Sequence, residues 1–235
     1  MSKASFDPSI MHKKNYPFFE RIFYRPAASP LVILAAKSGL GPTRVNIIGF
    51  LLGLTGIILV ALGGYKLRAI GGSLLVISYI LDCVDGQLAR ALKQADKFGA
   101  LFDTTLDSIK ESLIFFALAW THYLQTQNKY VFLYLAAILF LQRMFGRTMP
   151  WYRLIFRQGV EEIERDTIER SPKSLRFAAA AFSEAYRSGT IWIVVLIGVL
   201  TNQIIPTFIY FIVVLSALFL FLLSKAFREG RITKK

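Results

Sequence analysis

Six apolar runs, separated by short polar segments, constrain the fold of this 235-residue chain more than any other feature. A helix needs about 20 predominantly apolar residues to cross a bilayer, and most of the runs are close to that length. The runs occupy residues 43–64, 69–92, 97–121, 129–149, 186–201 and 204–226. A soluble domain would also carry more charge than the 18% found here. The sequence therefore predicts an all-α integral membrane protein with six transmembrane helices, in a single membrane-embedded domain over residues 1–235.

The first 28 residues have a different composition from the rest of the chain. They are polar and aromatic, and they lack the apolar core of a signal peptide. Residues 13–24 combine lysine and arginine with Tyr16, Phe18, Phe19, Phe23 and Tyr24. Because this mixture is typical of helices that lie in the membrane interface, we expect an N-terminal interfacial amphipathic helix here. A disordered basic tail is the alternative, and the five aromatic residues argue against it.

Lysine and arginine gather on one side of the predicted spans. With the N-terminus in the cytoplasm, all but three of the 28 Lys and Arg residues fall on the cytoplasmic side, the exceptions being Lys66, Arg68 and Lys129. The positive-inside rule therefore predicts a multi-pass protein with both termini, and the turn after the second span, in the cytoplasm. The formal net charge of +13 is then explained by membrane lipids with anionic headgroups. Nucleic acid is not an expected partner, because the basic residues form no separate module.

Four aspartates interrupt the second and third apolar runs: Asp82, Asp85, Asp103 and Asp107. The first two are three residues apart and share a helix face, and the last two are four residues apart and share another. Polar residues between the pairs predict a turn, with Asp96 as the N-cap of the second helix. Folding the helices antiparallel about this turn brings Asp82 opposite Asp107 and Asp85 opposite Asp103. The sequence thus predicts a cluster of four carboxylates between two helices.

The residue types in this stretch indicate metal-dependent phosphoryl chemistry. Carboxylates within membrane spans are costly and mark functional sites by default. Four of them cannot stay ionised together without cations, and ligands that are all oxygen favour Mg²⁺ or Mn²⁺. Such a set can bridge two metals, Gly86 and Gly99 leave room for a large ligand, and Arg90 can meet a phosphate. Acids solvated at helix ends would explain one or two aspartates, but not four on facing stripes.

This stretch resembles the signature of the CDP-alcohol phosphotransferase family, D-x2-D-G-x2-A-R-x8-G-x3-D-x3-D. Every fixed position is present: Asp82, Asp85, Gly86, Ala89, Arg90, Gly99, Asp103 and Asp107. The motif is long and gapped, so a chance match is improbable. Residues 41–46 also resemble the family's Thr-Pro-Asn-x-x-Thr segment, with Thr43 and Asn46 where Asn and Thr are commoner.

The resemblance implies an enzyme of phospholipid biosynthesis that transfers a phospho-alcohol group, such as phosphatidyl, from a CDP-alcohol to an acceptor hydroxyl. CMP is released, and CDP-diacylglycerol is the expected donor. By resemblance, Asp82, Asp85 and Asp103 hold two Mg²⁺ or Mn²⁺ ions per active site. Asp107 shares in the second metal site and acts as the general base. The residues implied for the CDP pocket are Gly86, Ala89, Arg90 and Gly99, and a homodimer is the implied assembly.

The acceptor is less constrained by the sequence. Arg143 and Arg147 lie one turn apart near the end of the fourth span, and Arg187 lies at the start of the fifth. These arginines favour a phosphorylated polyol, such as inositol phosphate, although topology alone also explains them. A partial match to choline and ethanolamine members keeps a transferase that acts on diacylglycerol open. Beside the aspartates, Lys110 and Glu111 are interpreted as supporting residues or as a buried ion pair.

Intramembrane carboxylates also occur in transporters, so a transporter is the alternative from another functional class. A transporter more often spreads such residues near the bilayer midplane, in broken helices or inverted repeats. Here they are concentrated on one hairpin near one membrane face. Cys83 is the only cysteine, which excludes an intramolecular disulfide and fits a reducing cytoplasmic face.

Overall fold

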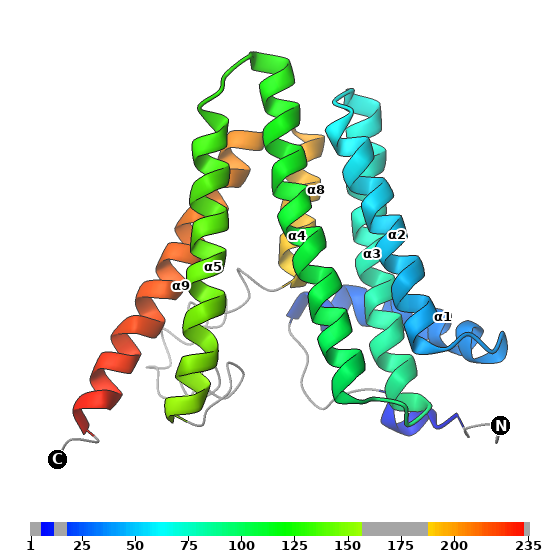
Figure 1. Ribbon diagram of the computed structural model, residues 1–235. Helices are drawn as coiled ribbons and strands as arrows, with labels where there is room; N and C mark the ends of the chain where they lie inside the picture. Colours follow the sequence, from blue (N-terminus) through cyan, green and yellow to red (C-terminus); the bar gives the residue numbers. More distant parts are fainter. Residues whose placement is uncertain (1–5, 12–17, 157–187, 233–235) are drawn as a thin grey trace. The chain divides into compact units, whose positions relative to one another are not determined.

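The computed structural model describes residues 6–11, 18–156 and 188–232, and these residues form α-helices without any strand. The α-helices are α1 (Arg25–Lys37), α2 (Pro42–Ala61), α3 (Tyr65–Ala91), α4 (Lys97–Thr126), α5 (Val131–Phe156), α8 (Ser188–Leu200) and α9 (Ile204–Ile232), as labelled in Figure 1. A 3₁₀ turn, η1 (Pro8–Ile10), and a π-helical segment, η2 (Glu20–Tyr24), precede α1. The predicted all-α class is therefore confirmed.

Each of the six predicted spans coincides with a helix, but the helices are not equally apolar. Three of the described helices are long and apolar enough to cross a membrane: Pro42–Ala61, Tyr65–Ala91 and Ile204–Phe221. Val131–Met144 and Gly189–Leu200 are apolar but shorter. Helix α4 is long enough, yet its charged residues, which include Asp103, Asp107 and Lys110, lower its hydropathy. The described helices thus agree with a membrane protein, whereas the number of six spans stays a prediction.

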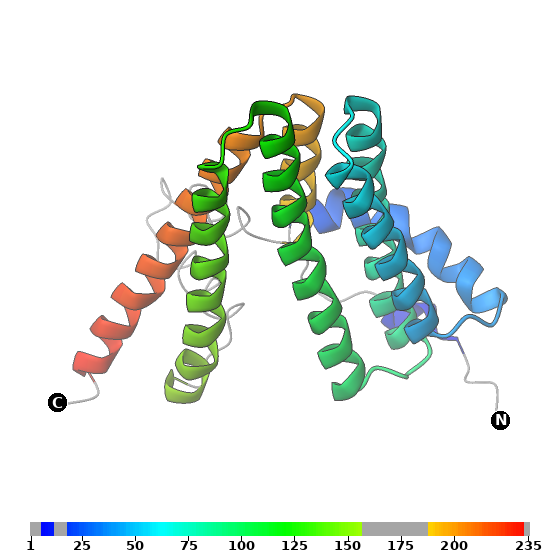
Figure 2. The ribbon, with the colours of Figure 1, turned by 45° about the horizontal axis from the view of Figure 1, so that its top comes forward.

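The chain divides into two compact units, and the first contains α1–α4 and α8. Within it α2 packs against both α3 and α4, and α2 and α3 run side by side in Figures 1 and 2. Small residues allow this approach, because a Cβ built on Gly56 would lie 2.7 Å from the carbonyl oxygen of Gly71. Close contact through small residues is the usual way in which membrane helices associate. Helix α2 is therefore the common partner of the two helices that carry the aspartates.

Away from these contacts, α2 exposes large apolar side chains: Ile47, Ile48, Leu51 and Ile58. Hydrophobic groups exposed in this number on one helix mark an interaction surface rather than ordinary solvent exposure. Together with the length of α2, this pattern fits a helix that presents one face to lipid and the other to its protein neighbours.

The N-terminal segment packs against α3 and the start of α8. Tyr24 is fully buried, its ring packs edge-on against that of Tyr79, and its hydroxyl donates a hydrogen bond to the carbonyl of Gly189 at 2.8 Å. Arg25 forms an ion pair with Glu20 at 2.7 Å and donates to the carbonyl of Cys83 at 3.1 Å. Tyr24 is thus a core residue rather than an interfacial one.

The predicted interfacial helix is therefore only partly comparable with the structure. Residues 13–17 of that prediction lie outside the described residues, and Phe18 and Phe23 are about half exposed. Helix α1, with Pro26 in its first turn and Pro30 in its interior, is absent from the helices predicted from the sequence. Proline in the first turn is favourable because the missing N–H has no helical partner there, whereas Pro30 removes one hydrogen bond.

The second unit contains α5 and most of α9. The rings of Tyr134 and Phe208 lie 6.5 Å apart and join the two helices. Val131 and Ile138 of α5 and Phe211 and Leu215 of α9 are fully buried. These contacts give the unit an apolar core of its own.

Candidate functional site

The turn that joins α3 to α4 matches the sequence-based expectation. Helix α3 ends at Ala91 and α4 begins at Lys97. The carboxylate of Asp96 accepts a hydrogen bond from the backbone N–H of Gly99 at 2.6 Å, so Asp96 is the predicted N-cap. This cap satisfies one of the unpaired N–H groups at the start of α4 and fixes where the helix begins.

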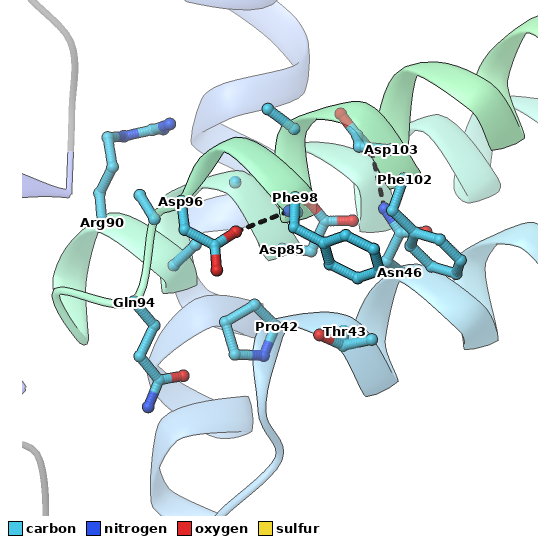
Figure 3. A pocket seen from close by; sticks show the side chains of 15 residues that line it. Pro42, Thr43, Asn46, Asp85, Arg90, Gln94, Asp96, Phe98, Phe102 and Asp103 are labelled. Carbon is cyan, nitrogen blue, oxygen red and sulfur yellow. Dashed lines mark hydrogen bonds between the residues drawn. The ribbon is translucent and has the colours of Figure 1, made fainter.

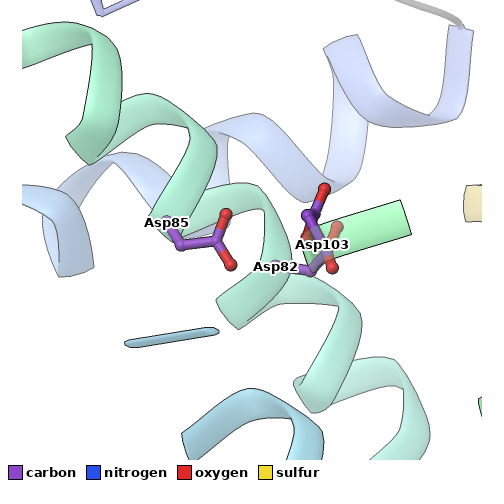
Figure 4. Close-up of side chains that lie close together, drawn as sticks. All are labelled: Asp82, Asp85 and Asp103. Carbon is purple, nitrogen blue, oxygen red and sulfur yellow. The ribbon is translucent and has the colours of Figure 1, made fainter. Parts of the chain in front are cut away.

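Three of the four predicted carboxylates form one cluster. Asp82 and Asp85 come from α3 and Asp103 comes from α4, and each offers an oxygen within 4.8 Å of the others (Figure 4). Asp85 is buried, and its Oδ2 atom has no hydrogen-bond partner within the described part of the chain. A buried carboxylate oxygen without a donor is costly unless a cation or water meets it. The residues therefore fit a hard divalent cation, which prefers oxygen ligands.

The fourth aspartate is held by a lysine. Nζ of Lys110 lies 2.7 Å from Oδ1 of Asp107 and 3.8 Å from Oδ1 of Asp82. Lys110 is buried, and its printed ion pairs are with Asp107 and Asp82. All four aspartates thus lie in one region, with a built-in positive charge on one side of it.

A pocket of about 320 Å³ opens beside this cluster (Figure 3). Its volume is at the lower end of the range of about 300–1,000 Å³ that is typical of small-molecule sites. All four residues predicted for the CDP pocket line it: Gly86, Ala89, Arg90 and Gly99. Asp85 and Asp103 line it as well, so the pocket and the carboxylate cluster share two residues.

The two motif glycines leave this pocket open. A Cβ built on Gly86 would meet only Nη1 of Arg90, at 3.6 Å, and one built on Gly99 would meet Oδ1 of Asp96, at 3.1 Å. The N-terminal segment helps to orient the side chain of Arg90, because Nε of Arg90 donates a hydrogen bond to the carbonyl of Met11 at 3.0 Å. The backbone of residues 7–11 is in turn tied to the end of α3 by a hydrogen bond from Asp7 N to Ala91 O.

Several further residues of the pocket have no site role in the prediction from the sequence. Asn46 of α2 donates from Nδ2 to Oδ1 of Asp103 at 2.7 Å (Figure 3). Phe98 and Phe102 of α4 line the pocket and stack on each other, with ring centroids 6.4 Å apart. The segment 41–46 had signalled Asn46 through its family-like pattern, whereas nothing in the sequence distinguished the two phenylalanines from lipid-facing residues.

The predicted acceptor arginines are only partly described. Arg143 is exposed on α5, in the second unit of the chain. The side chain of Arg147 and the whole of Arg187 lie outside the described residues. Their proposed convergence on the acceptor therefore stays a prediction.

Comparison with known proteins settles the family. A family model described as CDP-alcohol phosphatidyltransferase matches residues 42–217, which is most of the chain. The chain belongs to this family. The match begins at Pro42, at the start of α2, and it contains the whole carboxylate cluster and every residue of the pocket lining.

Individual relatives align over shorter stretches. An archaetidylinositol phosphate synthase of Pyrococcus horikoshii is 34% identical over 88 residues, which is 36% of this chain and 43% of that protein. A bifunctional IPC transferase and DIPP synthase of Rubrobacter xylanophilus is 40% identical over 80 residues, 34% of this chain and 18% of that protein. A phosphatidylinositol phosphate synthase of Streptomyces avermitilis is 30% identical over 99 residues, 41% and 39% of the two chains. Each alignment thus covers less than half of the relative.

Proposed function

We propose that this chain is a metal-dependent phosphotransferase that moves a phosphatidyl-type group from a lipid CDP-alcohol to a phosphorylated polyol of the inositol phosphate class. The observation that carries the proposal is that Asp85 and Asp103 belong both to the carboxylate cluster and to the glycine-lined pocket. A ligand in the pocket would therefore have its phosphates beside the carboxylates. This arrangement suits a nucleotide diphosphate better than a transported ion, so the family membership and the geometry both favour a transferase over a transporter.

The donor is proposed to bind through the parts of the pocket that lack side chains. Its diphosphate would run past Gly86 and Gly99, where a closer approach to the backbone is possible. Arg90 offers a guanidinium group with the planar geometry that phosphate oxygens match. Phe98 and Phe102 offer aromatic faces on which a pyrimidine can stack.

Asp82, Asp85 and Asp103, with Asp107 at the second position, are the proposed ligands of Mg²⁺ or Mn²⁺. When bound, such ions neutralise the diphosphate and stabilise the charge that develops on the departing CMP. The chain's own contribution is to fix the carboxylates: Asn46 holds Asp103 and Lys110 holds Asp107. Both contacts are charge-assisted, so they restrict the carboxylates more than a neutral hydrogen bond would.

Asp107 is the proposed general base. Its carboxylate would accept the proton of the acceptor hydroxyl as the acceptor oxygen attacks the phosphorus that carries the lipid alcohol. A new P–O bond forms to the acceptor, the P–O bond to CMP breaks, and the products are a phosphodiester and CMP. The proton stays on the carboxylate until it is released to solvent, so Asp107 must connect to water at some stage of the cycle.

The relatives support the choice of acceptor. Inositol phosphate appears in the names of the synthases from Pyrococcus horikoshii and Streptomyces avermitilis. Their names differ in the lipid group, which is archaetidyl in one and phosphatidyl in the other. The proposed donor is therefore a CDP-linked lipid of either type. For this chain we infer an acceptor that bears both a phosphate and a free hydroxyl.

The membrane arrangement is part of the proposal. Six spans, both termini on the cytoplasmic side and the aspartate hairpin on that same side would give the site access to nucleotides and divalent cations. The distribution of Lys and Arg supports this orientation. A homodimer is the assembly that we expect for the family.

The function is tested by measuring CMP release from purified protein in detergent with Mn²⁺. CDP-diacylglycerol, its ether-lipid counterpart and CDP-choline serve as donors, and inositol phosphate, inositol, glycerol phosphate, serine and diacylglycerol serve as acceptors. We expect turnover with inositol phosphate and background levels with unphosphorylated inositol. Turnover with diacylglycerol and CDP-choline instead would overturn the assignment of both substrates.

The acceptor subsite is tested by alanine variants of the arginines proposed to bind its phosphate, which are Arg143, Arg147 and Arg187. A charge-assisted hydrogen bond is worth about 1.5–3 kcal/mol, so each variant should raise the acceptor KM about tenfold to a hundredfold. The donor KM should change much less. Unchanged acceptor kinetics in all three variants would show that these arginines serve topology alone.

A further inference from the structure

Lys110 is a buried cation that lies against the carboxylate cluster. It lies on α4 three residues after Asp107, and it is 3% exposed. Its ammonium group contacts Asp107 at 2.7 Å and Asp82 of α3 at 3.8 Å. Oδ1 of Asp107 is buried and has no other partner within the described part of the chain.

A glycine of α2, Gly53, leaves room for the side chain of Lys110. A Cβ built on Gly53 would lie 3.0 Å from Cδ of Lys110 and 2.7 Å from the hydroxyl oxygen of Ser78. The same hydroxyl donates to the carbonyl of Gly49 at 2.7 Å, which fixes α3 against α2 at this level. The alkyl part of Lys110 therefore crosses the face of α2 at a position where only glycine leaves enough room.

A buried lysine is costly, because a lysine side chain usually keeps its ammonium group in water even where its alkyl part is buried. Instead its side chain is enclosed by three helices and ends between two acidic groups from different helices. Burial of a charge is tolerated when it is paired, and each partner then depends on the other. The geometry thus requires a role that involves the aspartates rather than solubility or topology.

We propose that Lys110 is a positioning residue that acts as an internal counter-cation of the carboxylate cluster. It holds Asp107 in the site, and it keeps α3 and α4 together when the cluster has no metal. It also repels a divalent cation at the neighbouring ligands, so it weakens metal binding and keeps it reversible. This second effect rests on the proposed function, because it requires the aspartates to bind a metal; the pairing with Asp107 does not.

The pairing is tested without metal, by thermal unfolding in EDTA of Lys110→Met, Asp107→Asn and the double variant. Methionine keeps an unbranched side chain beside Gly53 and removes the charge. Lys66→Met, at an exposed position at the other end of α3, is the matched control. We expect Lys110→Met to lower Tm by about 4 °C or more relative to the control, and the double variant to recover at least about half of that loss.

The effect on metal affinity is tested by titrating Mn²⁺ into the same proteins and following free Mn²⁺ by electron paramagnetic resonance. Removing a positive charge beside the ligands should lower the Kd for Mn²⁺ about tenfold or more in Lys110→Met. Lys66→Met should match the wild type. Saturating Mn²⁺ should also raise Tm more in Lys110→Met than in the wild type, a difference that loss of packing alone would not produce.

Three results decide between the alternatives. If the two single substitutions add in the double variant, and the Mn²⁺ affinities of wild type and Lys110→Met agree within about twofold, the proposal is wrong. If the wild type binds no Mn²⁺, the proposed metal site fails, and the EDTA series still decides whether Lys110 pairs with Asp107. If Lys110→Met does not fold, the double variant and Lys110→Arg supply the comparison, and a double variant that also fails to fold contradicts the pairing.

Discussion

Gly86→Ala separates ligand binding from folding at the proposed donor site. Gly86 lies within α3, and a Cβ at this position would meet only Nη1 of Arg90 at 3.6 Å, an ordinary van der Waals distance. The substitution should therefore fit the protein without its ligand. Alanine is favoured over glycine inside a helix by about 0.5–1 kcal/mol, so Tm should stay the same or rise by about 1–4 °C.

The donor should respond in the opposite direction. The added methyl group would project into the pocket of about 320 Å³, at the wall where the diphosphate is proposed to lie. A displacement of the reacting groups by about 1 Å can cost about a hundredfold in rate. We therefore expect kcat/KM for the CDP-alcohol to fall by about that factor, and the acceptor KM to change little.

The assay combines CMP release at varied donor concentration with thermal unfolding in the same detergent. Gly53→Ala is the matched control, since the same change there would place Cβ 2.7 Å from Ser78 Oγ and lower Tm through a cost of about 1–3 kcal/mol. Donor kinetics that stay unchanged in Gly86→Ala would refute the assignment of this pocket to the donor. A lower Tm in Gly86→Ala would show that the space is needed for packing.

Three further outcomes are expected. EDTA should abolish CMP release and added Mg²⁺ or Mn²⁺ should restore it, because the cluster offers only carboxylate ligands; turnover by metal-free protein would contradict the two-metal proposal. Asp107→Asn should abolish turnover but keep much of the affinity for a CDP ligand, whereas Asp82→Asn should weaken that affinity too, which titration of CDP against both variants measures. Asn46→Leu removes the 2.7 Å hydrogen bond to Asp103, which is worth about 1.5–3 kcal/mol, and should lower kcat/KM about tenfold to a hundredfold. A kcat/KM equal to that of the wild type would contradict this role of Asn46.

The parts of the fold that depend on local sequence could be predicted. The six helices at the apolar runs follow from length and composition, and the cap at Asp96 follows from the preference for Asp before a helix and from the polar turn. Helix α1 was missed because Pro26 and Pro30 signal a break, and its apolar run is too short for a span. The packing of η2 and α1 against α3, which offsets that cost, involves residues that are far apart in the sequence.

The parts of the site that depend on a third helix could not be predicted. The spacing of Asp107 and Lys110 permits an ion pair, but it equally permits a lysine that points to the membrane surface. Which of the two occurs depends on Gly53, in another helix. Asn46 is a similar case, because its contact with Asp103 requires α2 to pack at the level of the aspartates.

The role of α2 has a physical reason in the charge of the hairpin. Asp82 and Asp85 on α3 repel Asp103 on α4 when all three are ionised, and this repulsion opposes the approach of the two helices. Helix α2 packs against both helices through small residues. Its Asn46 donates a hydrogen bond to Asp103, and its Gly53 leaves room for the side chain of Lys110, which pairs with Asp107. The fold can thus keep a buried oxygen without a hydrogen-bond donor, such as Asp85 Oδ2, while α3 and α4 stay packed against α2. A helix outside the motif therefore makes a cation-binding surface compatible with a stable hairpin, and substitutions on its glycine face should affect metal binding as well as stability.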